Sequence, residues 1–296
     1  MSSSASSLFA IPVVGLVFVF CLSGVAGAQT AISTGREGGS YHAIGERLQA
    51  SLAADQGYEI SVSPSSGSTQ NLARLADPSS PVGLVLTQSD ALARFVKMNP
   101  EFASEYIVLG DAGKECVLAI GSSKGSLWSF ANLAAAEGTE VSVDGPGTGA
   151  AVTFGYLLEK DPDLSGLKIV YTDVMEAMLQ LQVGAANSAL GVVMIVQRPS
   201  VRSEVVEVLL ARSGDYRLLP IYASDVQGGR LPDESSVYTF ERVRVGGKSS
   251  AEGIEVDTLC MRSLLLASKS KLDRDTRSNL SRFMLMAGPR VFADPE

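Results

Sequence analysis

Apolar residues recur along the chain at two spacings, which indicate helices in some segments and strands in others. In residues 40–55, Ile44, Leu48 and Leu52 follow the spacing of a helix that buries one face. Residues 82–86 instead form the uninterrupted apolar run VGLVL, which is typical of a strand buried on both faces of a parallel sheet. The pattern therefore predicts helices packed against a buried sheet.

The same two patterns alternate through most of the chain. We expect strands at residues 29–33, 58–63, 82–86, 106–109, 116–120, 139–143, 168–171 and 188–195. We expect helices at residues 40–55, 68–76, 89–98, 149–160, 174–182 and 273–287. The repeated order of strand, helix and strand predicts an α/β protein with parallel strand pairs.

An uncharged apolar segment, residues 8–25, precedes the first predicted strand. The small residues at 26–28 (AGA) follow it and match the cleavage site of a secretory signal peptide. An uncleaved membrane anchor is the alternative, but a proline and a glycine interrupt the apolar run. We therefore expect a signal peptide over residues 1–28, cleavage after Ala28 and a mature protein in the periplasm.

Composition and charge exclude several classes of function. The chain of 296 residues has 24 Lys and Arg against 32 Asp and Glu, a net charge of -8. It therefore lacks the excess of cations with which proteins bind the phosphates of nucleic acid. Without the cysteine of the predicted signal peptide, one histidine and two cysteines are too few for the four ligands of a His/Cys zinc site. We expect no nucleic-acid partner, no metal and no cofactor.

Two cysteines, Cys116 and Cys260, remain after removal of the predicted signal peptide. In an oxidising compartment they could form a disulfide. Two buried free thiols within strands account for them equally well, because the sequence does not give the distance between them. Both alternatives stay open at this point.

Three glycine-rich turns, residues 34–41, 64–69 and 144–149, each follow a predicted strand and open a helix. Glycine lets the backbone approach a ligand, and the unpaired N–H groups of a first helical turn attract anions. Any one of these turns could simply be a tight connection. Three of them in one α/β chain favour a common binding site at the carboxyl ends of the strands.

Two segments match enzyme motifs, but neither has the context that its motif requires. Residues 121–125 (GSSKG) match the G-x-S-x-G pattern of hydrolases, but that mechanism needs a histidine after the serine, and His42 lies far upstream. Residues 145–150 (GPGTGA) match a dinucleotide-binding pattern, yet Pro146 lies within the turn and the motif stands in the middle of the chain. We expect no catalytic residues and no enzymatic activity.

Four segments together resemble the TAXI family of solute receptors, which serve tripartite ATP-independent periplasmic (TRAP) transporters. They are TGREGGSYHAIGERLQASL, SSGSTQNLARL, VGLVLTQSDALA and VSVDGPGTGAAVTFGYLLE, and the likeness covers residues 34–199. The chain departs from the family at Thr148, where Ser is usual, and at Asn187, where an acid is usual. These departures concern the identity of the ligand more than the fold.

The resemblance implies a type II periplasmic binding protein with two Rossmann-like lobes, a hinge and a ligand cleft between the lobes. We place lobe I at residues 29–115 and 218–296, and lobe II at residues 116–217. The ligand implied is a small organic anion of the amino acid, oxoacid or dicarboxylate class, passed on to a TRAP membrane permease. A ligand-sensing periplasmic protein of the same fold, signalling to a membrane partner such as a sensor kinase, is the alternative. A monomer is expected in either case.

Roles for individual residues follow from the resemblance. Backbone N–H groups near Gly39, Ser40, Gly147 and Thr148 are expected to bind a ligand carboxylate, and Tyr41 is expected to cover the cleft. Asp90 is expected either to hold a ligand amine or to cap its own helix. The remaining predicted ligand-binding residues are Ser68, Asn71, Gln88, Pro146, Gly149 and Tyr238.

Overall fold

The computed structural model describes residues 30–136, 138–183, 189–222, 229–247 and 252–293. Its strands are β1 (Thr30–Ser33), β2 (Ile60–Ser63), β3 (Val82–Gln88), β4 (Tyr106–Ser122), β5 (Glu140–Ser142), β6 (Lys168–Val170), β7 (Leu190–Gln197), β8 (Tyr216–Leu218), β9 (Tyr238–Val245) and β10 (Ile254–Ser268). Its α-helices are α1 (Ser40–Gln56), α2 (Ser68–Ala76), α3 (Ser89–Met98), α4 (Ala131–Ala134), α5 (Gly149–Lys160), α6 (Val174–Val183), α7 (Glu204–Ala211) and α8 (Arg274–Val291). The predicted signal peptide and Asn187 lie outside the described residues.

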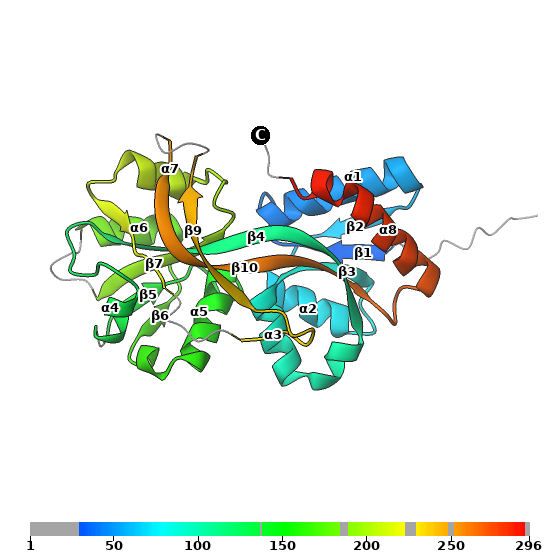
Figure 1. Cartoon of the computed structure of the whole chain (residues 1–296), viewed down its shortest axis with the longest axis horizontal. Helices are drawn as coiled ribbons and strands as arrows, with labels where there is room; N and C mark the ends of the chain where they lie inside the picture. The colour runs from blue at the N-terminus through cyan, green and yellow to red at the C-terminus, as the bar shows by residue number, and fades with distance from the viewer. Residues whose placement is uncertain (1–29, 137, 184–188, 223–228, 248–251, 294–296) are drawn as a thin grey trace, which may run out of the picture.

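Strands and helices form two lobes on one continuous sheet (Figure 1). Within the described chain the strand order is β2-β1-β3-β10-β4-β7-β5-β6, with β8 paired to β4 and β9 paired to β10. Lobe I is built on the parallel strands β2, β1 and β3, and lobe II on the parallel strands β6, β5 and β7. The prediction of an α/β class with parallel pairs is confirmed.

In lobe I, helices α1 and α8 pack on one face of the sheet. Ile44, Leu48 and Leu52 of α1 are buried in a cluster with Ile32 of β1 and Phe283 of α8. The helical spacing of the apolar residues therefore produced the buried face that it predicts.

A second cluster runs from lobe I into lobe II. It contains Leu72 and Leu92 of helices α2 and α3, and Phe154 and Leu157 of α5. Helices α3 and α5 accordingly lie side by side where the two lobes meet (Figure 1). The two lobes are thus in direct apolar contact in this structure.

Two long antiparallel strands, β4 and β10, connect the lobes (Figure 1). β10 pairs with β3 of lobe I through residues 263–267 and with β9 through residues 254–261. β4 pairs with β7 of lobe II through residues 116–120. The sequence predicts two separate strands at 106–109 and 116–120, and here one strand covers both.

Cys116 of β4 and Cys260 of β10 are paired residues in this antiparallel ladder, and they form a disulfide. Their Cα atoms are 4.0 Å apart, and both side chains are buried. Of the two alternatives left open by the sequence, the structure has the disulfide. The bond joins the two connecting strands to each other between the lobes.

Among the described helices, none is both long enough and apolar enough to cross a membrane.

Candidate functional site

A cavity of about 160 Å³ lies between the two lobes, and we call it the cleft. Seven residues predicted to bind ligand line it: Gly39, Ser40, Tyr41, Ser68, Gln88, Thr148 and Gly149. It is also lined by Gly35, Arg36, Ser66, Gly67, Glu115 and Val196. The first and second glycine-rich turns reach it from lobe I, and the third reaches it from lobe II, so the structure brings the three turns together.

Helices α1 and α2 both begin at the cleft. Gly39 and Gly67 precede them with extended or glycine-specific backbone, and no side chain caps either helix. The N–H groups of the first turns that begin at Ser40 and Ser68 therefore lack the oxygen acceptor that a capping side chain supplies. Two such helix ends directed at one cavity favour the binding of an anion.

Helix α5 differs, because Thr148 caps it. The Thr148 hydroxyl accepts a hydrogen bond from the Ala151 N–H at 3.3 Å and lies 2.9 Å from the Val143 carbonyl oxygen. The Thr148 N–H donates to the Gly145 carbonyl, and the Gly39 N–H donates to Arg36 in the same way. In this structure two of the four predicted backbone donors are therefore occupied within their own turns.

Asn71 does not line the cleft. Its side chain is buried beneath the first turn, where its amide donates to the carbonyl groups of Leu86 and Thr34. It also accepts a hydrogen bond from the Ser33 hydroxyl at 2.6 Å. These bonds connect β1 and β3 to α2, so Asn71 holds the turns in place around the cavity.

Asp90 and Tyr238 also lie outside the cleft, at the contact between the lobes. The Asp90 carboxylate accepts hydrogen bonds from the Thr153 hydroxyl of α5 at 2.6 Å and from the Tyr238 hydroxyl at 3.0 Å. Burial raises the pKa of Asp90, and the hydrogen bonds from Thr153, Ala91 and Tyr238 oppose that shift. In this structure Asp90 therefore links the two lobes and binds its neighbouring backbone N–H.

Neither Pro146 nor Gly147 lines the cleft, but the Gly147 backbone forms part of the contact between the lobes. The Gly147 carbonyl oxygen lies against Gly67, so closely that a Cβ atom added to Gly67 would overlap it. A Cβ added to Gly149 would lie 2.6 Å from the Gln88 amide nitrogen. Glycine at 67 is thus required for the lobes to approach each other as they do here, whereas a side chain at 149 would displace the Gln88 amide.

Ion pairs also cross between the lobes beside these glycines. Arg36 of lobe I lies 2.6 Å from Asp144 of lobe II, and Arg94 of α3 lies 2.6 Å from Glu159 of α5. The Arg36 side chain is largely exposed, so its pair with Asp144 contributes little to stability. Together with the glycine contacts, these pairs describe a closed arrangement of the lobes.

Glu115 and Val196 line the cleft from outside the glycine-rich turns, and the sequence predicted neither of them as a site residue. Glu115 is the charged one of the two. It is 6% exposed and accepts hydrogen bonds from the Tyr41 hydroxyl at 3.0 Å and from the Gln88 amide at 3.1 Å. Burial raises the pKa of Glu115, while Tyr41, Gln88, Ser263 and Arg198 oppose the shift. Its position directly before Cys116, in the segment expected to cross between lobes, was the available signal.

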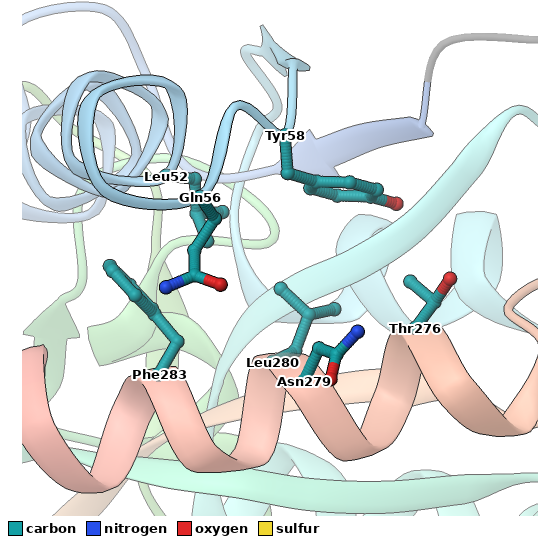
Figure 2. A pocket seen from close by; sticks show the side chains of 7 residues that line it. All are labelled: Leu52, Gln56, Tyr58, Thr276, Asn279, Leu280 and Phe283. Atoms are coloured by element: carbon teal, nitrogen blue, oxygen red, sulfur yellow. The ribbon is translucent and has the colours of Figure 1, made fainter.

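Another cavity lies on the outside of lobe I, between α1 and α8 (Figure 2). Its volume is about 100 Å³, and Tyr58, Leu280 and Phe283 line it together with the amides of Gln56 and Asn279. Figure 2 shows that α8 and the end of α1 supply most of this lining. None of the seven labelled residues is charged, so the cavity lacks the features of a site for a charged solute.

The described residues contain no cluster of three or more His, Cys, Asp or Glu side chains placed to hold a metal ion.

No protein-family model matches the chain, and no curated protein matches its sequence. Solved structures do match. XAC2383 from Xanthomonas citri bound to ATP is 11% identical, covers 90% of this chain and 88% of its own, and has a TM-score of 0.53. The same protein bound to chloride ion is also 11% identical, covers 91% of this chain and 86% of its own, and has a TM-score of 0.52.

The ArgBP P235GK mutant from T. maritima is 11% identical over 89% of this chain and 92% of its own, with a TM-score of 0.48. At such identities the likeness concerns the fold alone. XAC2383 shares this fold, and the two lobes joined by connecting strands agree with the type II periplasmic binding protein architecture that the sequence predicts.

Proposed function

We propose that this protein is a periplasmic solute-binding protein of the TAXI type, which holds a small organic anion between its lobes and delivers it to a TRAP permease. The observation that carries the proposal is the direction of α1 and α2, whose uncapped N-termini open on one cavity between the two lobes. The segments that resemble the TAXI family lie around that cavity or support its walls. Closure of two lobes over a ligand is a common use of such a cleft.

Binding is tested by thermal unfolding of the mature chain, residues 29–296, with amino acids, oxoacids, dicarboxylates and aliphatic acids. We expect one acid to raise the melting temperature, because a ligand at about 100 times its Kd stabilises the folded state by roughly 2.7 kcal/mol. Calorimetric titration then gives the Kd. If no small acid shifts the transition while a lipid or a neutral molecule does, the assignment of an anionic ligand is wrong.

The permease is tested by uptake of that labelled acid into cells with and without the gene. We expect uptake to need the gene, to survive depletion of ATP and to stop when the ion gradient is collapsed. Loss of the gene with unchanged uptake, but with a changed transcriptional response to the acid, would favour a sensor partner instead.

Tyr41→Phe should weaken binding of the acid about tenfold. The hydroxyl that it removes donates to the buried Glu115 and lies 3.3 Å from the Ser263 hydroxyl. That bond also forms without ligand, so its loss changes the Kd only through the position of Glu115 in the cleft, and about 1.4 kcal/mol corresponds to a factor of ten in Kd. Tyr58→Phe is the matched control, because it removes a hydroxyl bonded to Thr30 outside the cleft. Equal Kd values for the two variants would remove Tyr41 from the site.

We also propose a later second limit of lobe II, near Cys260 instead of residue 217. What supports this is the packing of β9 and the first part of β10. Val245 and Val256 are buried in one cluster with Leu118 and Val206, which come from the lobe II end of β4 and from α7. The first limit, between Glu115 and Cys116, is kept as predicted from the sequence.

A further inference from the structure

We propose that Glu115 and Gln88 form an ammonium subsite in the cleft, so that the solute is a zwitterion with a protonated amine beside its carboxylate. This inference rests on the proposed function and narrows its ligand class. It selects amino acids and related ammonium-bearing acids over oxoacids and dicarboxylates.

The first observation is an acceptor without a donor. Gln88 is 3% exposed and lines the cleft, and its side-chain oxygen Oε1 is buried with no hydrogen-bond partner among the described residues. Its nitrogen donates to Glu115 Oε2. That bond sets the orientation of the amide, because the reverse orientation would place the oxygen against the carboxylate. A buried acceptor left unpaired is costly, so a donor from the ligand would be favourable here.

The second observation is a buried carboxylate beside that acceptor. Both hydrogen bonds that Glu115 accepts from Tyr41 and Gln88 end on Oε2, and Oε1 takes part in neither. Ser263 and the nearby guanidinium of Arg198 also lower the pKa of Glu115, and Arg198 donates to the carbonyl groups of Ala112 and Phe292 as well. A buried negative charge needs a positive partner or several donors. An ammonium group has three N–H donors, which suits Glu115 and Gln88 Oε1 together.

The third observation is the opposite polarity of the two ends of the site. The uncapped helix ends at Ser40 and Ser68 attract a negative group, and Glu115 attracts a positive one, within a single cavity. An oxoacid would place a carbonyl oxygen, which only accepts, next to two acceptors. A dicarboxylate would place a second negative charge there. Sites built to pair a ligand donor reject analogues that lack it by large factors.

The test uses matched pairs of probes on the mature chain at pH 7, by calorimetric titration. The pairs are L-glutamate with 2-oxoglutarate, L-leucine with 4-methyl-2-oxopentanoate, and L-alanine with pyruvate, which differ by an amine against a ketone. We expect at least one amino acid to bind about 100-fold or more tightly than its oxoacid. An oxoacid that binds as tightly as its amino acid, or more tightly, overturns the ammonium subsite and leaves the proposed function standing. If the titrations and the wider acid screen both find no binding, the proposed function fails and the subsite fails with it.

Glu115→Gln gives the residue-level test, because it removes the charge and keeps the size of the side chain. We expect the amino acid to lose about 30-fold or more in affinity, with the affinity for the oxoacid unchanged or increased. Glu241→Gln is the matched control, since it removes one carboxylate that pairs with Lys114 outside the cleft. An equal loss for both members of a probe pair would assign Glu115 a structural role only and overturn the proposal. If Glu115→Gln does not fold, the proposal is decided by the ratio of the Kd of each oxoacid to that of its amino acid, measured on the native chain.

Discussion

Reduction of the Cys116–Cys260 disulfide is expected to lower the free energy of unfolding of the mature protein by about 3–5 kcal/mol. The bond closes a loop with a sequence separation of 144 residues, and it restricts the unfolded chain far more than the folded one. In the folded state the two residues already face each other in the ladder between β4 and β10. Denaturant unfolding with and without reductant measures the difference.

Cys116→Ala with Cys260→Ala is the companion variant. The reduced native chain loses the covalent bond alone, whereas the double variant also loses two buried sulfur atoms, so comparison of the two separates cross-linking from packing. We expect both to be clearly less stable than the oxidised protein and the variant to be insensitive to reductant. A count of two free thiols in the denatured, unreduced mature protein would show that the bond does not form.

Gly67→Ala is expected to weaken ligand binding by about 100-fold or more, because it prevents the lobes from closing. The added methyl group would overlap the Gly147 carbonyl of lobe II, and backbone at that position cannot move aside as a flexible side chain can. Gly67 also has φ 134 and ψ -164, a conformation that costs other residues about 1–3 kcal/mol. Solution scattering should show that the native protein contracts when ligand binds and that the variant does not.

Gly57→Ala is the matched control for that experiment. Gly57 also has a positive φ, at 60°, but it ends α1 and has nothing within 4 Å of an added Cβ. It therefore introduces backbone strain without any contact across the cleft. We expect a modest loss of stability and an unchanged Kd. If Gly67→Ala binds ligand as well as Gly57→Ala does, the contact with Gly147 does not govern closure.

Sequence patterns predicted the helices around the cleft better than the strands between the lobes. Helices α2, α3 and α5 begin and end at the predicted residues. Gly67 marks the start of α2, and the capping residue Thr148 marks the start of α5. β4 was predicted as two pieces, at 106–109 and 116–120, with Gly110, Asp111 and Gly113 between them. Those residues are part of a strand because β10 pairs with them through two irregularities in register. Pairing partners so distant in sequence leave no local signal.

The candidate site could be predicted at the level of turns but not of atoms. The glycine-rich segments identified which parts of the chain surround the cleft. They could not show that the Asn71 amide donates a hydrogen bond to the backbone of β3, or that Asp90 accepts one from Thr153 across the lobes. Glu115 has no periodic or motif signature at all, because its role comes from contacts with Tyr41 and Gln88, which lie on other elements.

With the second limit of lobe II near Cys260, as we propose, the pairing of Cys116 with Cys260 makes lobe II an inserted module. Their Cα atoms are 4.0 Å apart, close to the 3.8 Å that separates successive residues of one chain. Everything between them therefore leaves and re-enters the remainder of the protein at almost one point. One half of the cleft would then come from a single contiguous segment, whereas the other half is assembled from two distant parts of the chain.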